Sequence, residues 1–364
     1  MITVEVGRKV DAEAWNARVR ELPGGSIFQT TYLATYFAAY LGAKPHYLVF
    51  RKGGEVIGQL LILEMLRGHE SFLRGVKASL GRLIAPLLRV FAWREGPLIS
   101  EPGQRDEVLL ACLQTVEDLA LERGVTGLED VFLPVAESYD PPEISGFLRH
   151  GYHMQQRATI RIDVRRPLDL LWANLKKDVA RTPIRKAQRQ GLKFREVGSP
   201  SEVEEFYQLV RSWRRDHSLA PYTFAKYDKM FEYMNPHCSF FIADYSDRAV
   251  GGSGLWHFNG RAYLFTPVQS ALACEHRIYA GDFLYWEMIR WCHDRGFEVL
   301  DLSGISFSPA SQKEGGIRRF KEKWGGRVVE YPIFTRPLKQ FLWKGADLLR
   351  YARHRAAKVF IKTE

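Results

Sequence analysis

The feature that most constrains this chain is a succession of local patterns that occurs twice. Residues 11–134 predict helices, a strand pair around a Gly-Gly turn, a helix that ends at an Arg-Gly pair, and a strand. Residues 200–304 repeat that order, with a hairpin at Ser246-Asp247 and a second helix that ends at an Arg-Gly pair. The sequence therefore predicts two related lobes of the α/β class, each with a mixed sheet.

The repeat predicts lobe 1 over residues 1–158 and lobe 2 over residues 159–335. Residues 336–364 are then predicted to form a helix with an apolar face and a basic face. Such a helix is typical of a membrane-surface segment and equally of a terminal helix packed on lobe 1 with a solvated basic back. Lobe 1 also carries an extra basic segment, whose run SLGRLIAPLLRVF (79–91) fits a pair of core strands better than an interfacial surface.

Positive charge is concentrated in three segments of a chain whose formal net charge is +10. Residues 67–94 carry six basic residues against one acid, residues 165–195 ten against two, and residues 336–364 eight against two. This clustering predicts an anionic partner, namely phosphate, nucleic acid or membrane headgroups, with solvated helix faces as the simpler alternative.

Cysteine usage and the absence of export signals indicate a cytoplasmic protein. Cys112, Cys238, Cys274 and Cys292 have no paired spacing, which argues against disulfides and against a zinc site. The first residues show no signal peptide, and no window approaches the roughly 20 apolar residues of a membrane span. The histidines show no metal-ligand spacing, so no metal is predicted.

The stretch 296–331 has the most unusual chemistry in the chain. A buried strand ends at Asp301, and a polar loop rich in Gly and Ser, which includes Ser303, leads to Phe320, Lys321 and Trp324. A loop at the carboxyl end of a strand is where open α/β sheets bind ligands, and a lysine there can stabilise an oxyanion or a phosphate. Local sequence alone favours the simpler interpretation of Lys321 as a surface lysine and of the two aromatic residues as core anchors.

Two other motifs carry weaker signals. Asp216-His217 is interpreted as the end of a helix, although a carboxylate beside a histidine could support base chemistry. Ser253 lies in a predicted hairpin strand, so it is not the nucleophile of a strand-turn-helix elbow.

The second half of the chain resembles the FemAB family of aminoacyltransferases. The resemblance rests on the helix GDFLYWEMIRWCHDRG, the strand that ends at Asp301, and the later GGIRRFKEKWGG, which contains Phe320, Lys321, Trp324 and Gly325. The segment WANLKKDVARTPIRKAQRQG also resembles the family, with Arg181, Arg185 and neighbouring positions matching. The resemblance covers much of residues 165–335 and extends more loosely over lobe 1.

That resemblance implies two tandem GNAT-like acyltransferase lobes, in agreement with the internal repeat. It implies a cytoplasmic aminoacyltransferase of cell wall biogenesis, which moves an amino acid from aminoacyl-tRNA to an amine of a peptidoglycan precursor. Phe320 and Lys321 are implied at the acyl-transfer centre. The implied substrate contacts are Arg181, Arg185, Lys186, Tyr263, Asp301, Ser303, Trp324 and Gly325.

The donor stays open at this point. The loop Asp301-Leu302-Ser303-Gly304 departs from the Asp-Phe-Gly of many relatives, and no coiled-coil arm is present. A CoA thioester donor in cell-envelope or exopolysaccharide synthesis is one alternative, although the sequence before Asp282 matches a pyrophosphate loop only partly. A non-catalytic binder of an anionic polymer or membrane is the other. No other cofactor and no DNA partner are predicted, and contact with the inner face of an anionic membrane is compatible with all three.

Overall fold

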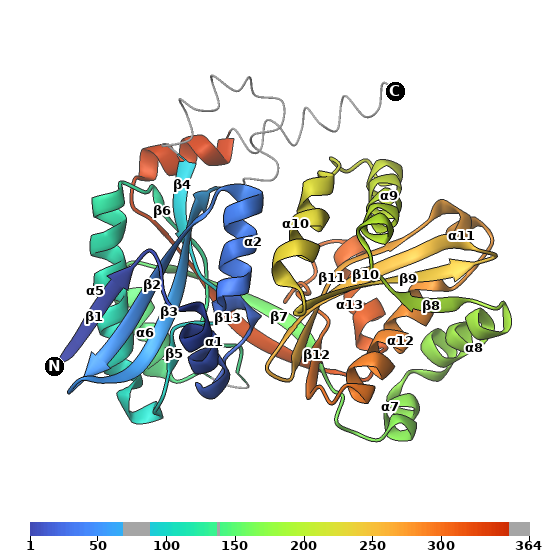
Figure 1. Cartoon of the computed structure of the whole chain (residues 1–364), viewed down its shortest axis with the longest axis horizontal. Helices are drawn as coiled ribbons and strands as arrows, with labels where there is room; N and C mark the ends of the chain where they lie inside the picture. Colours follow the sequence, from blue (N-terminus) through green and yellow to red (C-terminus); the bar gives the residue numbers. More distant parts are fainter. Residues whose placement is uncertain (68–87, 137–138, 349–364) are drawn as a thin grey trace. The chain divides into compact units, whose positions relative to one another are not determined.

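The computed structural model describes residues 1–67, 88–136 and 139–348 (Figure 1). The chain forms two compact units, of which unit 1 comprises Met1–Gln156 with Tyr331–Glu364 and unit 2 comprises Arg157–Glu330. Among the described residues, no helix has the length and the apolar character that crossing a membrane requires. The mixed α/β architecture predicted from the sequence is confirmed.

Unit 1 begins with a strand and two helices, continues with a strand hairpin, and then alternates strands and helices. Its elements are β1 (Ile2–Gly7), α1 (Ala12–Glu21), η1 (Ile27–Gln29), α2 (Thr31–Leu41), β2 (Lys44–Lys52), β3 (Glu55–Leu66), β4 (Arg89–Ala92), β5 (Leu98–Ile99), η3 (Pro102–Gln104), α5 (Arg105–Arg123), β6 (Gly127–Val131) and α6 (Pro141–Arg149).

Unit 2 follows the same order after a helical lead-in. The lead-in is α7 (Leu168–Asn174), η4 (Lys177–Arg181) and α8 (Thr182–Arg189). The repeated elements are β8 (Lys193–Glu196), α9 (Pro200–Asp216), α10 (Phe224–Met234), β9 (Cys238–Tyr245), β10 (Arg248–Phe258), β11 (Arg261–Gln269), α11 (Ala271–Glu275), α12 (Ala280–Asp294), β12 (Val299–Asp301) and α13 (Gln312–Glu322).

The last strand of each repeat pairs in the sheet of the other unit. Strand β7 (His153–Asp163) follows α6 but pairs with β12, and β13 (Arg327–Pro337) follows α13 but pairs with β6. The strand order is therefore β1-β2-β3-β4-β6-β13 in unit 1 and β8-β9-β10-β11-β12-β7 in unit 2. In both units the fourth and fifth strands pair in parallel, which makes the two topologies equivalent.

Turn chemistry sets the two hairpins that the sequence predicts. Gly53 and Gly54, with φ of 60° and 90°, connect β2 to β3. Ser246 and Asp247, with φ of 47° and 58°, connect β9 to β10. Positive φ at both central positions gives a tight turn whose twist matches that of the flanking strands, so both hairpins close in the register that buries their apolar faces.

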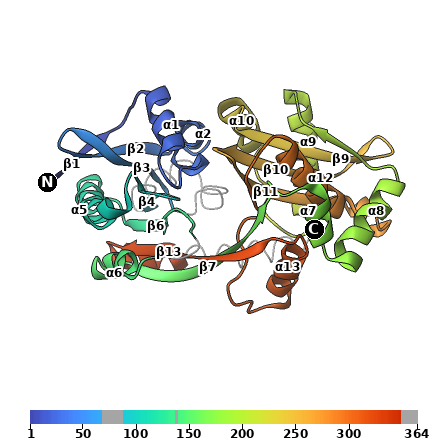
Figure 2. The ribbon, with the colours of Figure 1, turned by 90° about the horizontal axis from the view of Figure 1, so that it is seen from below.

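Helices cover both faces of each sheet. In unit 1, Trp15 of α1 packs edge-on against Tyr47, whereas the next residue, Leu48, belongs to the core that contains α5. The helices α1 and α5 accordingly lie on opposite faces of the sheet (Figure 2). In unit 2, a side chain on Gly251 would meet Leu284 of α12, and one on Gly252 would meet Phe206 of α9. Because successive residues of a strand point to opposite faces, α9 and α12 lie on opposite sides of β10.

The remaining predictions on organisation have mixed outcomes. The helical segment before β8 is interrupted near Pro183, as predicted, because α8 starts anew at Thr182 after a π-helical turn. Residues 79–87 of the run in lobe 1 lie outside the described residues, and Val90 and Phe91, at its end, are buried in unit 1. Helical residues 340–348 pack on unit 1 through Trp343, and residues 349–364 lie outside the described part.

Candidate active site

The sheet of unit 2 opens between β11 and β12. These strands pair in parallel at only three positions, from Arg261↔Val299 to Tyr263↔Asp301. Beyond that point β11 continues beside β10, with an irregular register opposite Ser253 and a φ of 47° at Thr266. Side chains do not close the opening, and a cavity of about 790 Å³ lies there, at the carboxyl end of β12.

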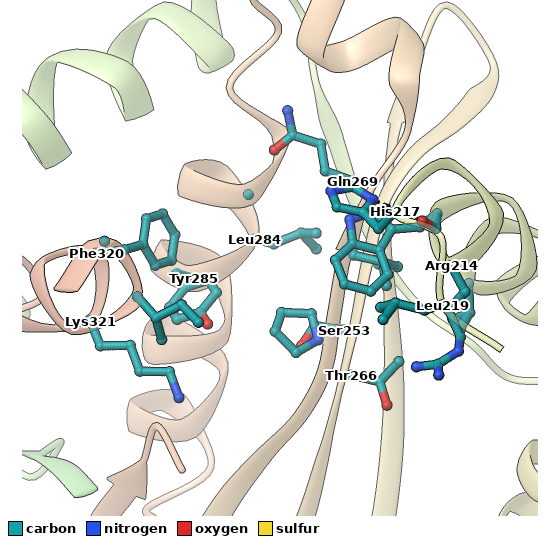
Figure 3. Close-up of a pocket in the computed structure, with 18 of the residues that line it drawn as sticks. Arg214, His217, Leu219, Ser253, Thr266, Gln269, Leu284, Tyr285, Phe320 and Lys321 are labelled. Carbon is teal, nitrogen blue, oxygen red and sulfur yellow. Dashed lines mark hydrogen bonds between the residues drawn. The ribbon is translucent and has the colours of Figure 1, made fainter. Parts of the chain in front are cut away.

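Four helical or loop segments and two strands line the cavity (Figure 3). Phe320 and Lys321 of α13 lie on one side, and Arg214 and His217 lie on the other (Figure 3). The full lining is Val210, Trp213, Arg214, His217, Leu219, Tyr222, Gly252, Ser253, Thr266, Pro267, Val268, Gln269, Gly281, Leu284, Tyr285, Gly304, Lys313, Gly316, Ile317, Phe320 and Lys321. All of these residues belong to unit 2.

Lys321 is a buried lysine whose ammonium group is held in place by backbone carbonyl groups. Its Nζ donates hydrogen bonds to the carbonyl oxygens of Ser303 and Gly304, each at 3.0 Å. Only 8% of the residue is exposed. Burial lowers the pKa of Lys321 from 10.5 to about 8, although attraction to Asp301 acts in the opposite direction. The simpler interpretation of Lys321 as a surface lysine is therefore wrong, and its side chain is buried at the cavity wall.

Asp301 anchors the loop that holds Lys321. Its carboxylate accepts hydrogen bonds from the Thr159 hydroxyl, from Arg161 Nε at 2.9 Å and from the Ser303 backbone N–H at 2.8 Å. The Ser303 hydroxyl in turn donates to the Leu264 carbonyl, and Ser303 adopts a φ of 64°. This network turns the Ser303 and Gly304 carbonyls toward α13, so Asp301 acts on Lys321 through the loop.

Aromatic stacking fixes the helix that carries Lys321. Trp324 is fully buried and stacks on Tyr285 of α12 with ring centroids 5.0 Å apart, and Phe320 meets Tyr285 edge-on at 5.1 Å. Lys323 forms an ion pair with Asp282 of α12 and lies 4.1 Å from the Phe320 ring centre. Burial raises the pKa of Asp282, whereas Lys323 opposes that shift. These contacts attach α13 to α12 and present Phe320 to the cavity.

The opposite side of the cavity consists of the end of α9 and the residues after it. His217 ends α9 and stacks on Trp213 with ring centroids 4.3 Å apart. Arg214 donates from Nε to the Ala220 carbonyl at 2.6 Å, and its guanidinium carbon lies 3.8 Å from the Tyr222 ring centre. These two contacts fix the position of the Arg214 cation.

The charge of the cavity is one-sided. Among the described lining residues, Arg214, Lys313 and Lys321 are basic and none is acidic. Apolar side chains such as Leu284 and Ile317 lie between the two cationic sides. Such a cavity suits a ligand with apolar portions and negative charge, either permanent or developed during reaction.

Of the other predicted site residues, Phe320, Asp301 and Ser303 lie around Lys321. Phe320 lines the cavity, and Asp301 and Ser303 form the loop behind Lys321. Trp324 is a core residue beneath the cavity, which agrees with the simpler interpretation from local sequence. Gly325, next in the chain, has a φ of 74°, and a side chain there would lie 2.9 Å from Asn174 Cβ; glycine is therefore required by the backbone.

The other predicted contacts do not line the cavity. Arg185 and Lys186 are exposed on α8, over the rings of Trp172 and Tyr279 at 5.4 and 5.6 Å. Arg181 lies in the π-helical turn, and its Nε is buried without a hydrogen-bond partner among the described residues. Tyr263 is buried in β11, opposite Asp301. Contacts of these four residues with substrate remain predictions.

Sequence reasoning missed the α9 side of the cavity. Asp216-His217 was interpreted as a helix end, which is confirmed, but His217 also faces the cavity. Ser253 lies in a strand, as predicted, and its hydroxyl donates to the Phe265 carbonyl while the residue lines the cavity. The composition at the end of α9, with Trp213, Arg214 and His217, is unusual for a helix end. The sequence does not indicate that these residues face a cavity, because that depends on the fold.

Comparison with known proteins gives this geometry a family context. Residues 175–322 match the family described as acetyltransferase (GNAT) domain, and this range contains every lining residue of the cavity. The crystal structure of FemX superposes with a TM-score of 0.73 at 12% identity and covers 93% of this chain and 99% of its own. The chain has the FemAB-like tandem GNAT fold. A search of curated protein sequences finds no match.

Two further structures share this tandem GNAT fold. L-PGS from Bacillus licheniformis superposes with a TM-score of 0.57 at 14% identity, over 95% of this chain and 98% of its own. A tandem GNAT protein from the clavulanic acid biosynthesis pathway gives 0.56 at 14% identity, over 92% and 98%. At these identities the likeness establishes the fold. The family match lies within unit 2, which therefore contains the GNAT acyltransferase domain of the chain.

Proposed function

We propose that this protein transfers an aminoacyl group from aminoacyl-tRNA to an amine of an anionic, peptidoglycan-type cell-envelope precursor. The observation that carries the proposal is Lys321, a buried ammonium group at a cavity with no acidic lining, inside the matched acyltransferase domain. The structural likeness to FemX and L-PGS supports an envelope-related reaction of this class.

The reaction asks this chain to stabilise one developing negative charge. The neutral amine of the acceptor attacks the carbonyl carbon of the aminoacyl ester, and the carbonyl oxygen becomes negative as the C–N bond forms. The bond to the ribose oxygen then breaks, and the proton lost by the amine ends on that oxygen. Two carbonyl groups already accept hydrogen bonds from the Lys321 ammonium, which leaves a third N–H for the oxyanion.

The site favours an ester donor over a CoA thioester. Asp282 lies in the first turn of α12, and a pyrophosphate bound there would have to face the N–H groups of this turn. Lys323 forms an ion pair with the Asp282 carboxylate. Its ammonium group is therefore not free to bind a phosphate at this position. The cationic side around Arg214 remains available for the negative charge of the acceptor.

The direct test is transfer of label from the donor to the acceptor. We expect the purified protein to move a radiolabelled amino acid from aminoacyl-tRNA to a nucleotide-linked muropeptide, with a product mass increased by one residue and no product after ribonuclease treatment. Transfer from acetyl-CoA without RNA would contradict the donor assignment. Salt-sensitive binding to RNA without product from any donor would identify a non-catalytic binder and contradict the proposal.

A further inference from the structure

The described part of the C-terminal segment is a short helix clamped onto one end of unit 1. Arg67, 6% exposed at its side chain, donates to the Trp343 carbonyl at 3.1 Å and lies 3.5 Å from the Trp343 ring centre. Arg67 also pairs with Asp347 at 3.0 Å. The Trp343 ring packs so closely on Gly127 that a side chain there would lie 2.5 Å from the ring. The orientation of residues 340–348 on unit 1 is therefore fixed.

That orientation turns two large apolar side chains away from the protein. Phe341 is 89% exposed and Leu348 is 70% exposed. Seven residues separate them, so they lie on the same face of the helix, opposite the buried Trp343. Leu121, 68% exposed in the last turn of α5, lies at the same end of unit 1, because Lys339 donates to the carbonyl of Gly124 just after α5.

Several strands and helix α5 begin or end at this end of unit 1, and exposed basic side chains lie beside them. Strands β2, β4 and β6 begin here, and β3, β13 and α5 end here, as the pairings Leu66↔Arg89 and Gly127↔Pro337 show (Figure 1). Lys339 and Lys344 are exposed. Three of the described acids at this end are paired, Glu122 with Arg123, Asp347 with Arg67, and Glu64 with Lys44 and Arg89.

The two segments that join the described chain at this end are basic in sequence. Residues 68–87 join the described chain at Arg67 and Leu88, and residues 349–364 join it at Leu348. Their sequences contain three basic residues against one acid and five against one acid, respectively. A soluble partner need not offer negative charge beside an apolar surface. A bilayer with anionic headgroups offers both an apolar and a negative phase to the exposed side chains of Phe341 and Leu348 and of Lys339 and Lys344.

We propose that this end of unit 1 docks on an anionic lipid bilayer, with Phe341 and Leu348 inserted at the level of the headgroups and with Lys339 and Lys344 against the phosphates. Leu121 extends the inserted surface. The helix lies on the membrane and does not span it. This inference does not depend on the proposed function, because it rests on unit 1, whereas the cavity lies in unit 2.

Vesicle flotation of the full chain tests the docking. We expect wild-type protein to float with vesicles that contain phosphatidylglycerol and phosphatidylcholine, and to stay largely unbound with phosphatidylcholine alone. Because the attraction is partly ionic, raising NaCl from roughly 0.1 to 0.5 M should weaken it. The double variant Phe341→Ser/Leu348→Ser should lower the partition coefficient about tenfold or more, since it removes the two inserted side chains.

A control for the loss of exposed apolar side chains is available elsewhere in the chain. Leu110 and Leu170 are 50% and 51% exposed, and the double variant Leu110→Ser/Leu170→Ser removes two exposed apolar side chains without touching the proposed face. It should bind like the wild type. Binding of Phe341→Ser/Leu348→Ser at the wild-type level would overturn the proposal. A second result would also overturn it: light scattering shows that the wild type is an oligomer and that Phe341→Ser/Leu348→Ser is a monomer, and vesicles bind neither protein. The face would then be an interface between two copies of the chain.

Discussion

Replacing Lys321 with methionine is expected to lower kcat by about 100-fold or more. Methionine keeps the length of the side chain but removes the ammonium group of a residue that lines the cavity beside Phe320. Loss of one donor to a developing oxyanion typically costs two to three orders of magnitude in rate. Substrate affinity should change much less than kcat, because the interaction forms fully only in the transition state.

The pKa of Lys321 makes the same prediction testable by pH. Burial holds this pKa at about 8, so the active ammonium form is lost as the pH rises through about 8, and kcat/KM should fall there. The variant Lys321→Met should lack this alkaline decline. For stability the sign is the reverse: the cost of burying the ammonium is full below pH 8, and it fades as the pH rises toward 10.5, where the unfolded chain also loses the proton.

Lys313 supplies the matched control on the same helix. It also lines the cavity but is exposed, eight residues before Lys321. The substitution Lys313→Met removes the same group from the same cavity and should change kcat by less than about threefold. Equal losses in both variants would mean that the cavity needs positive charge in general, and full activity of Lys321→Met with a normal unfolding curve would remove Lys321 from the mechanism.

The second large effect is expected on stability, from Asp301→Ala. Asp301 is 5% exposed and pairs with Arg161, whose side chain is 11% exposed. Removing one partner of a buried ion pair typically costs about 3–5 kcal/mol, and we expect a loss of that size in the free energy of unfolding by urea. Activity should fall as well, because the Ser303 N–H loses its acceptor and the loop carbonyls that hold Lys321 are released.

Asp163→Ala is the control for this change. Asp163 lies on β7, as Arg161 does, and pairs with Arg165, whose side chain is 64% exposed. Because solvent screens an exposed pair, the free energy of unfolding should remain nearly unchanged. If both variants lost the same stability, the effect would come from the strand and not from the Asp301 network.

Local sequence predicts much of this fold because its signals are local. The Gly53-Gly54 and Ser246-Asp247 turns allow little besides a hairpin, and the glycines at 124 and 296 end their helices. These signals recur in the same order, which is sufficient to predict two lobes. The exchange of β7 and β13 between the sheets was not predicted, because strand pairing depends on packing far along the chain.

The candidate site was predicted only in part, for a related reason. The composition of the segment around Lys321 is unusual, but the sequence predicts a polar loop before Phe320 and Lys321 and not the helix α13, because Gly315 and Gly316 disfavour a helix interior. Ser311, which caps α13 through the Glu314 N–H, was the signal for its start. Arg214 and His217 lie about a hundred residues before Lys321 in the chain, and only the folded sheet brings them to the same cavity.

The most direct measurement of the central claim is a crystal structure with a non-hydrolysable donor analogue, an aminoacyl group joined by an amide to the 3′ position of adenosine. The account predicts that the acyl group lies in the cavity between α9 and α13, with its carbonyl oxygen about 3 Å from Lys321 Nζ. An analogue bound elsewhere, with the cavity empty and Lys321 hydrogen-bonded only to Ser303 and Gly304, would contradict it.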